Sequence, residues 1–78
     1  MKFFDLMIML RRKGIVALMA DRDIPNQRAL AVAMGMNEGQ LSRLLGRDDI
    51  SNVELSSIEK MCAALDCQPG DILAYTPD

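Results

Sequence analysis

Two consecutive short segments in the middle of the chain constrain its fold more than any other feature. Asn26 and Gly35 bound the first segment, and Asn37 and Gly46 bound the second. Asparagine is a good N-cap because its side-chain oxygen accepts a hydrogen bond from the first helical turn. Gly35 can take the left-handed conformation that stops a helix, and Gly46 ends the second segment. The pattern predicts two short helices joined by a tight turn, a helix-turn-helix over residues 27–45.

The apolar residues of both segments recur at the spacing of one helix face. Ala31 is small at a point where two helices must cross closely, and Met36 is expected to pack just after the turn. We expect both apolar faces to be buried against the rest of the domain. They consist of Leu30, Ala31 and Met34 in the first helix, and Leu41, Leu44 and Leu45 in the second.

The opposite face of the second helix carries no large apolar residue. Its side chains can read base edges or hold phosphates, since Arg43 can pair with guanine or phosphate and Glu38 can accept from cytosine. Gly39 costs about 1 kcal/mol of helix stability relative to alanine. One interpretation is that it lets the backbone come close to DNA. The exposed face is predicted to consist of Glu38, Gly39, Gln40, Ser42 and Arg43.

The N-terminal part of the chain predicts a further helix over about residues 15–22. Pro25 follows, and the residue before a proline avoids the helical region. Residues 3–10 are apolar apart from Asp5 and leave two alternatives open, a short strand or a leading helical turn. Gly14 weakens any single helix that would run through from residue 3.

The C-terminal part predicts two more helices after a polar loop over residues 47–53. Ser56 and Glu59 have the spacing of a capping box, which would start a fourth helix. Pro69 falls in the first turn of a last short helix, and residues 76–78 would form a frayed tail. The side chains expected to pack back onto the body are Ile72, Leu73 and Tyr75.

Length and composition favour a small helical domain. The 78 residues allow one domain over residues 1–78, half of the residues are apolar, and three are aromatic. Many alanine, leucine and methionine residues and few β-branched or aromatic ones favour an all-α fold, a compact five-helix arrangement, over a sandwich or barrel. A core this thin would gain from a second copy, so we expect a homodimer.

The charge is distributed unevenly along the chain, although the net charge is −2. Residues 1–47 carry eight basic and four acidic side chains, whereas residues 48–78 carry one basic and seven acidic ones. Nucleic-acid affinity depends on the face that meets the phosphates rather than on the net charge. The basic half is the half that contains the predicted helix-turn-helix.

Several functional classes find no support in the sequence. There is no histidine to activate Ser42 and no pair of carboxylates at a plausible site, so we expect neither an enzyme nor a cofactor. Two cysteines without histidine cannot close a zinc site in one chain, and we expect no metal. Cys62 and Cys67 are five residues apart, do not share a helix face and are expected to pack as small apolar residues.

The expected location is the cytoplasm, with association with the nucleoid when DNA is bound. A disulfide framework is implausible with two cysteines, which fits a reducing compartment. The apolar run at the N-terminus is interrupted by Asp5 and is too short to span a bilayer, so we expect no membrane association.

The pattern Gln27-x3-Ala31-x3-Gly35-x5-Leu41-x2-Leu44 resembles the Cro/phage-repressor-type (Xre-like) helix-turn-helix family. The closing segment over residues 58–75, IEKMCAALDCQPGDILAY, is similar to that of a compact subgroup of the same family. Together the two stretches extend the resemblance to roughly residues 15–77.

The resemblance implies a five-helix lambda-repressor-like bundle that acts as a dimeric transcriptional regulator, usually a repressor, on double-stranded DNA operators. By position, Gln27 would touch the DNA backbone, and Asn37, Gln40 and Arg47 would lie nearer the phosphates. The major-groove residues would be Glu38, Gly39, Ser42 and Arg43. With Asn26 and Arg28, which flank Gln27, they form the predicted DNA-binding set.

A second interpretation keeps the fold but changes the function. The acidic half after residue 47 and the apolar N-terminal extension over residues 1–11 would also suit a protein-interaction module, such as an antitoxin or an anti-repressor. The basic run at Arg11-Arg12-Lys13 is interpreted as a solvated turn rather than as an arm that enters the minor groove.

Overall fold

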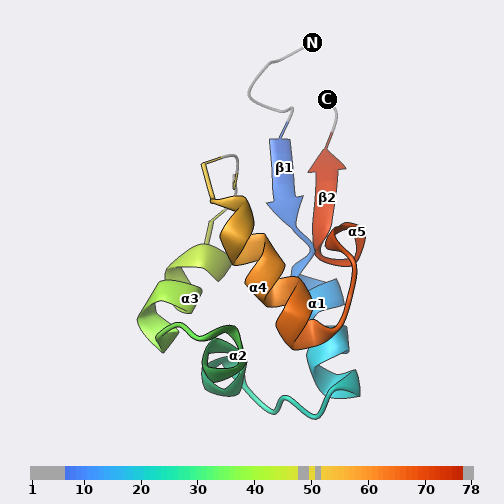
Figure 1. The fold of residues 1–78 in the computed structure, drawn as a ribbon. Coiled ribbons are helices and arrows are strands. Elements are labelled where there is room, and N and C mark those ends of the chain that lie inside the picture. The colour runs from blue at the N-terminus through green and yellow to red at the C-terminus, as the bar shows by residue number, and fades with distance from the viewer. Residues whose placement is uncertain (1–6, 48–49, 51, 77–78) are drawn as a thin grey trace.

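The computed structural model describes residues 7–47, 50 and 52–76. Within these residues five helices and one two-stranded antiparallel sheet follow along the chain (Figure 1). The predicted compact five-helix fold is therefore confirmed. The elements are β1 (Met7–Leu10), α1 (Arg12–Asp21), α2 (Gln27–Met34), α3 (Glu38–Leu45), α4 (Leu55–Leu65), α5 (Pro69–Ile72) and β2 (Leu73–Thr76).

One apolar cluster holds all five helices together. Each helix contributes at least one fully buried aliphatic side chain. Burial of each such side chain stabilises the fold by roughly 1.5–3 kcal/mol. Among the described residues no polar or charged side chain is buried in this cluster. The largest fully buried side chains are Ile15 of α1, Leu30 of α2, Leu41 of α3, Met61 and Leu65 of α4, and Ile72 of α5.

Gly14 lies inside α1, where it permits a close helix contact. The helix begins at Arg12, three residues before the predicted start. A Cβ atom at Gly14 would lie 3.1 Å from the backbone carbonyl oxygen of Asp71, a residue of α5. A side chain here would make a tight contact with this backbone oxygen, and the two helices would have to shift by a few tenths of an ångström to admit it.

The two strands form a ribbon that projects from the helical body (Figure 1). Of the two alternatives for residues 3–10, the strand is the one found over Met7–Leu10; residues 1–6 lie outside the described part of the chain. Ile8 lies opposite Tyr75. The amide of Ile50 donates to the carbonyl oxygen of Ile8 at 3.3 Å, and the Ile50 side chain is buried. The loop predicted to be polar thus supplies a core residue.

The prediction that Tyr75 packs back onto the body is wrong, because its side chain is 60% exposed. Leu73 and Tyr75 share one face of β2, since alternate residues of a strand point the same way. Leu73 is close to the helices and half-buried, whereas Tyr75 lies two residues farther along the projecting ribbon. Thr76 belongs to β2 rather than to a tail, and the predicted tail residues 77–78 lie outside the described residues.

The predicted capping box at the start of α4 is also wrong. The helix begins one residue before Ser56, and Glu54 occupies the extended N-cap position with φ −68° and ψ 142°. The Ser56 hydroxyl instead donates to Oε2 of Glu54 at 3.2 Å. Ser56 cannot cap the helix because its own backbone is already helical.

Arg22 closes the other end of α4 from a distant part of the chain. Its Nε donates to the carbonyl oxygen of Leu65 at 2.9 Å, and its Nη2 donates to that of Asp66 at 3.0 Å. The last carbonyl groups of a helix lack partners within the helix, so this guanidinium satisfies two of them. No helix within the described residues has the length and apolar character needed to cross a membrane.

Candidate nucleic-acid interface

The connection between α2 and α3 is fixed by glycine geometry and by two asparagine caps. Asn26 accepts from the amide of Ala29 at 2.8 Å and so begins α2. Gly35 has φ 72° and ψ 30°, and its left-handed turn lets the amide of Met36 donate to the carbonyl oxygen of Ala31 at 3.0 Å. These bonds confirm the predicted cap and the predicted turn.

Asn37 and Gln40 cap α3 reciprocally. The amide of Gln40 donates to Oδ1 of Asn37 at 2.8 Å, and the amide of Asn37 donates to Oε1 of Gln40 at 3.2 Å. This capping box engages both side-chain oxygens, so the Gln40 amide nitrogen is the part of that side chain left to donate outward. Gly46 ends the helix as predicted, in right-handed rather than left-handed conformation.

Burial of Leu41 and Leu44 turns the opposite face of α3 to solvent. All five residues predicted for that face, Glu38, Gly39, Gln40, Ser42 and Arg43, are exposed. The two charged residues of this face interact favourably with the helix dipole, because Glu38 lies in the first turn and Arg43 in the last.

Gly39 is not required by the fold. Its φ is not in the left-handed region, and a Cβ atom there would meet only Oδ1 of Asn37, at an ordinary contact distance of 3.4 Å. By contrast, Gly35 has a positive φ that a side chain would strain. Glycine at position 39 therefore lowers the stability of α3 relative to alanine, and no close packing contact in this chain requires it.

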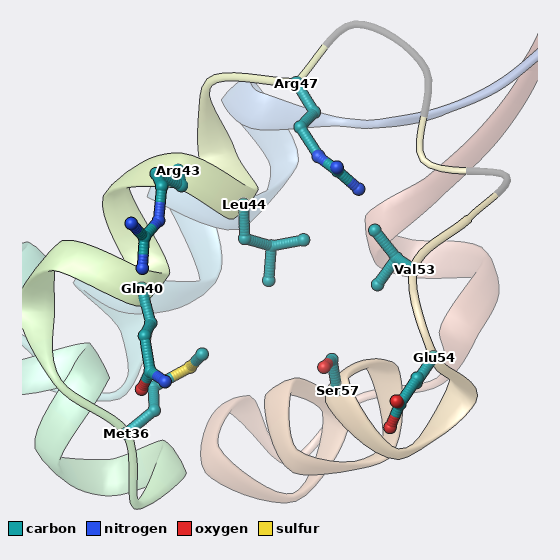
Figure 2. Close-up of a pocket in the computed structure, with 8 residues that line it drawn as sticks. All are labelled: Met36, Gln40, Arg43, Leu44, Arg47, Val53, Glu54 and Ser57. Carbon is teal, nitrogen blue, oxygen red and sulfur yellow. The ribbon is translucent and has the colours of Figure 1, made fainter.

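An open groove of about 620 Å³ separates α3 from the first turn of α4 (Figure 2). Arg43 of α3 and Arg47, just beyond the end of α3, lie on one side, and Glu54 and Ser57 lie on the α4 side. The structure therefore brings together three predicted site residues, Gln40, Arg43 and Arg47, with an α4 wall that was not predicted. Nothing local in the sequence indicates that wall, because tertiary packing alone places α4 there. The remaining lining residues are Met36, Leu44 and Val53.

Arg12 reaches the end of α3 from the first turn of α1. Its Nε donates to the carbonyl oxygen of Leu45 at 2.8 Å, and its Nη2 donates to that of Arg47 at 2.8 Å. The interpretation of the basic run as a solvated turn is wrong for Arg12, which begins α1 and, although exposed, is hydrogen-bonded to the C-terminal end of α3. The partners are more than thirty residues away, so no local signal could have indicated them.

The predicted residues at the start of α2 are positioned unequally. Gln27 is half-buried and lines a small pocket of about 220 Å³ between α1 and the ends of α2 and α3. The Asn26 side chain is used as a cap, and Arg28 is exposed. Gln27 is therefore less accessible to a ligand than Arg28.

A protein-family model described as a Cro/C1-type HTH DNA-binding domain matches residues 15–78. The chain belongs to the Cro/C1-type helix-turn-helix family. This match covers most of the chain, including α1 to α5 apart from the first turn of α1. The predicted resemblance is thereby confirmed, and α2 and α3 are the helix-turn-helix of this Cro/C1-type domain.

A relative with a curated description supports the same family. The uncharacterized HTH-type transcriptional regulator YozG of Bacillus subtilis (strain 168) is 41% identical over 49 residues. The aligned region covers 63% of this chain and 57% of that relative, so the chain spans a little over half of its length. No solved structure matches the chain.

The family is one of DNA-binding domains, so residues 15–78 form a DNA-binding domain of the Cro/C1 type. The relative YozG is described as a transcriptional regulator. The second interpretation from the sequence, a protein-interaction module, is not favoured by these matches.

Proposed function

We propose that this protein is a sequence-specific transcriptional repressor that binds duplex DNA with α3 in the major groove. The observation that carries the proposal is the solvent face of α3. That face carries small, polar and charged side chains and is held rigidly by the capping box and by Arg12. An α-helix fits the major groove, where each base pair presents a distinct pattern of donors and acceptors. We place its action in the cytoplasm, on the nucleoid, with residues 1–78 as one DNA-binding domain.

The residues divide into base-reading and phosphate-binding groups. Glu38, Ser42 and Arg43 project from the exposed face of α3 and would meet base edges, with Gly39 allowing close approach of the backbone. Phosphate contacts fix the register of a protein on DNA without reading sequence. In our proposal these contacts come from Asn26, Gln27, Arg28, Asn37, Gln40 and Arg47.

Gln40 and Arg47 are the strongest candidates for phosphate contacts on structural grounds. The Gln40 oxygen is engaged in the α3 cap, so the side chain can meet DNA as a donor, which is what a phosphate requires. Arg47 lines the same groove from the loop just beyond the end of α3. A sugar–phosphate backbone running past this groove would meet both residues.

A first experiment measures which residues read sequence and which bind phosphate. DNA fragments selected from a random pool, and the promoter of the protein's own operon, are titrated at several salt concentrations. Arg43→Ala is expected to cost about 1–3 kcal/mol and to relax specificity at one base pair, because a bidentate base contact is lost. Arg47→Ala is expected to weaken all sequences alike and to reduce the salt slope by about one.

Lys60→Ala is the matched control, since it removes an exposed positive charge from α4 and leaves α3 unchanged. It is expected to leave specificity intact. Undiminished affinity in both Arg43→Ala and Gln27→Ala would contradict the proposed contacts.

We further propose that the protein binds DNA as a homodimer. Ile8 and Tyr75 lie directly opposite one another on the ribbon and are 45% and 60% exposed. An isolated two-stranded ribbon is marginally stable in water, so covering this apolar pair with a second copy would stabilise it. Two copies would place their α3 helices in major grooves about one helical turn, ~34 Å, apart.

Light scattering over a range of protein concentrations tests the dimer. Tyr75→Ser is expected to shift the protein toward the monomer, because it removes apolar area from the proposed interface. Val16→Ser, at a similarly exposed apolar position on α1, is the control and is expected to leave the mass unchanged. A monomer mass at every concentration of the unmodified protein would refute the dimer.

The same exposed pair also supports the second candidate, a protein-interaction module on this fold. In that case a different protein would cover Ile8 and Tyr75. Co-purification of a stoichiometric partner, together with no binding to any DNA pool, would favour this function over the repressor.

A further inference from the structure

The turn that ends α4 brings two cysteines together. Asp66 takes the left-handed conformation, with φ 50° and ψ 59°, and reverses the chain directly after Leu65. The amide of Cys67 then donates to the carbonyl oxygen of Cys62 at 3.1 Å. In this type of helix end the side chains of the two hydrogen-bonded residues commonly lie in contact.

The two thiols also interact with each other. The pKa of Cys67 is raised from 9.0 to about 11, first by burial and then by the charge and hydrogen bonding of Cys62. Asp71 raises this pKa further, and Arg22 lowers it. The two cysteines do not share a helix face, as the spacing of five residues indicated, because α4 ends at Leu65, between them. The turn at Asp66 is what brings Cys67 back to Cys62.

One of the two thiols can be reached from solvent. Cys62 is half-buried and lines an open groove of about 470 Å³, together with Leu55, Ile58, Glu59 and Pro69. This groove is wide enough for a small oxidant such as a hydroperoxide. Both cysteines are free in the structure.

We propose that Cys62 and Cys67 form a reversible disulfide when the protein meets a hydroperoxide. The backbone hydrogen bond joins the two residues directly, and the hydrogen bond between their side chains brings the two sulfurs together, as a disulfide requires. No residue of the proposed DNA-binding set takes part, so this inference is independent of the proposed function.

The chemistry balances in two steps. The Cys62 thiolate attacks one oxygen of hydrogen peroxide, the O–O bond breaks, and hydroxide leaves, so that Cys62 becomes a sulfenic acid. The Cys67 sulfur then attacks the Cys62 sulfur, the S–O bond breaks, and the hydroxyl group leaves as water with the Cys67 proton. Overall, two thiols are oxidised to one disulfide and one peroxide is reduced to two waters.

The test follows both thiols in one peptide. The reduced full-length protein is exposed to graded hydrogen peroxide, the remaining thiols are blocked in denaturant, and trypsin is added. Because Lys60 is the last basic residue, both cysteines fall in the peptide over residues 61–78. We expect this peptide to lose about 2 Da, to carry no blocking group, and to recover both thiols with dithiothreitol. Independent loss of the thiols, or covalent dimers in place of the internal bond, would overturn the proposal.

Two comparisons show whether the fold accelerates formation of the disulfide. Closure is expected to be at least about tenfold faster in the folded protein than in urea, because the fold holds the two sulfurs in position. The double variant Cys62→Ala, Ala63→Cys keeps two thiols but moves one to an exposed position on α4, and its closure is expected to fall to the rate in urea. Equal rates for the unmodified protein in buffer and in urea would refute the role of the helix end, whether or not the variant folds.

Discussion

Replacement of Arg12 by alanine separates the support of α3 from the contacts with DNA that we propose for it. The guanidinium donates two hydrogen bonds of 2.8 Å to carbonyl oxygens at the end of α3, those of Leu45 and Arg47. Hydrogen bonds from charged groups are each worth about 1.5–3 kcal/mol, but these are exposed and water can replace them. We therefore expect a total loss of about 1–2 kcal/mol in the free energy of unfolding. For a domain of this size the melting temperature would fall by roughly 5–10 °C.

Urea denaturation followed by far-ultraviolet circular dichroism measures this loss. Lys13→Ala is the control for charge, because it removes a neighbouring exposed cation from the same turn of α1. Arg12→Lys keeps the charge but loses the planar fork, so it is expected to recover only a small part of the stability. If Arg12→Ala and Lys13→Ala unfold at the same urea concentration, the two hydrogen bonds contribute nothing and the reasoning fails.

Arg22→Ala is the matched variant for DNA binding. Arg22 also closes a helix end with two hydrogen bonds, but on α4 rather than on α3. Both variants should lose similar stability, whereas only Arg12→Ala should weaken DNA binding under conditions in which each variant is fully folded. Equal DNA affinities of the two folded variants would show that Arg12 does not position α3 for binding.

Three further predictions concern single residues. Gly39→Ala should raise the free energy of unfolding by roughly 0.5–1 kcal/mol, because the fold has room for a Cβ atom, yet it should weaken DNA binding. Gly35→Ala should instead lower the free energy of unfolding, because its positive φ strains any side chain. A calorimetric melt in which both variants lose stability would contradict this. Glu54→Gln should tighten DNA binding by roughly threefold at low salt and less at high salt, since it removes a negative charge from the groove beside Arg47. Unchanged affinity in a filter-binding titration would count against a DNA backbone that runs past this groove. The pKa of Cys67 is raised to about 11 from 9.0, so folding favours the protonated thiol. The protonated thiol therefore contributes fully to the free energy of unfolding below pH 9, and this contribution is lost as the pH rises through 11. Urea midpoints of the unmodified protein should therefore fall toward those of Cys67→Ser over that range, and parallel curves would refute the assignment.

Local physical chemistry explains which predictions from the sequence succeeded. The Asn26 and Asn37 caps and the left-handed turn at Gly35 each depend on atoms no more than five residues apart. Their geometry is therefore encoded where they occur. The same holds for the apolar faces of α2 and α3, whose period alone decides which side is buried.

Predictions failed where another part of the chain decided the outcome. Ser56 has the right spacing for a cap, but Glu54 already holds the extended position before the helix. Tyr75 has an apolar ring, but the ribbon carries it beyond the body.

The sequence by itself therefore determined the helix-turn-helix, its caps and the exposed face of α3, because these follow from residues that are neighbours along the chain. Only the tertiary structure decided that α4 forms the opposite wall of the groove, and that Arg12 and Arg22, at the two ends of α1, close the ends of α3 and α4. Such contacts join residues more than thirty positions apart. They depend on the packing of all five helices around the core, which no local pattern specifies.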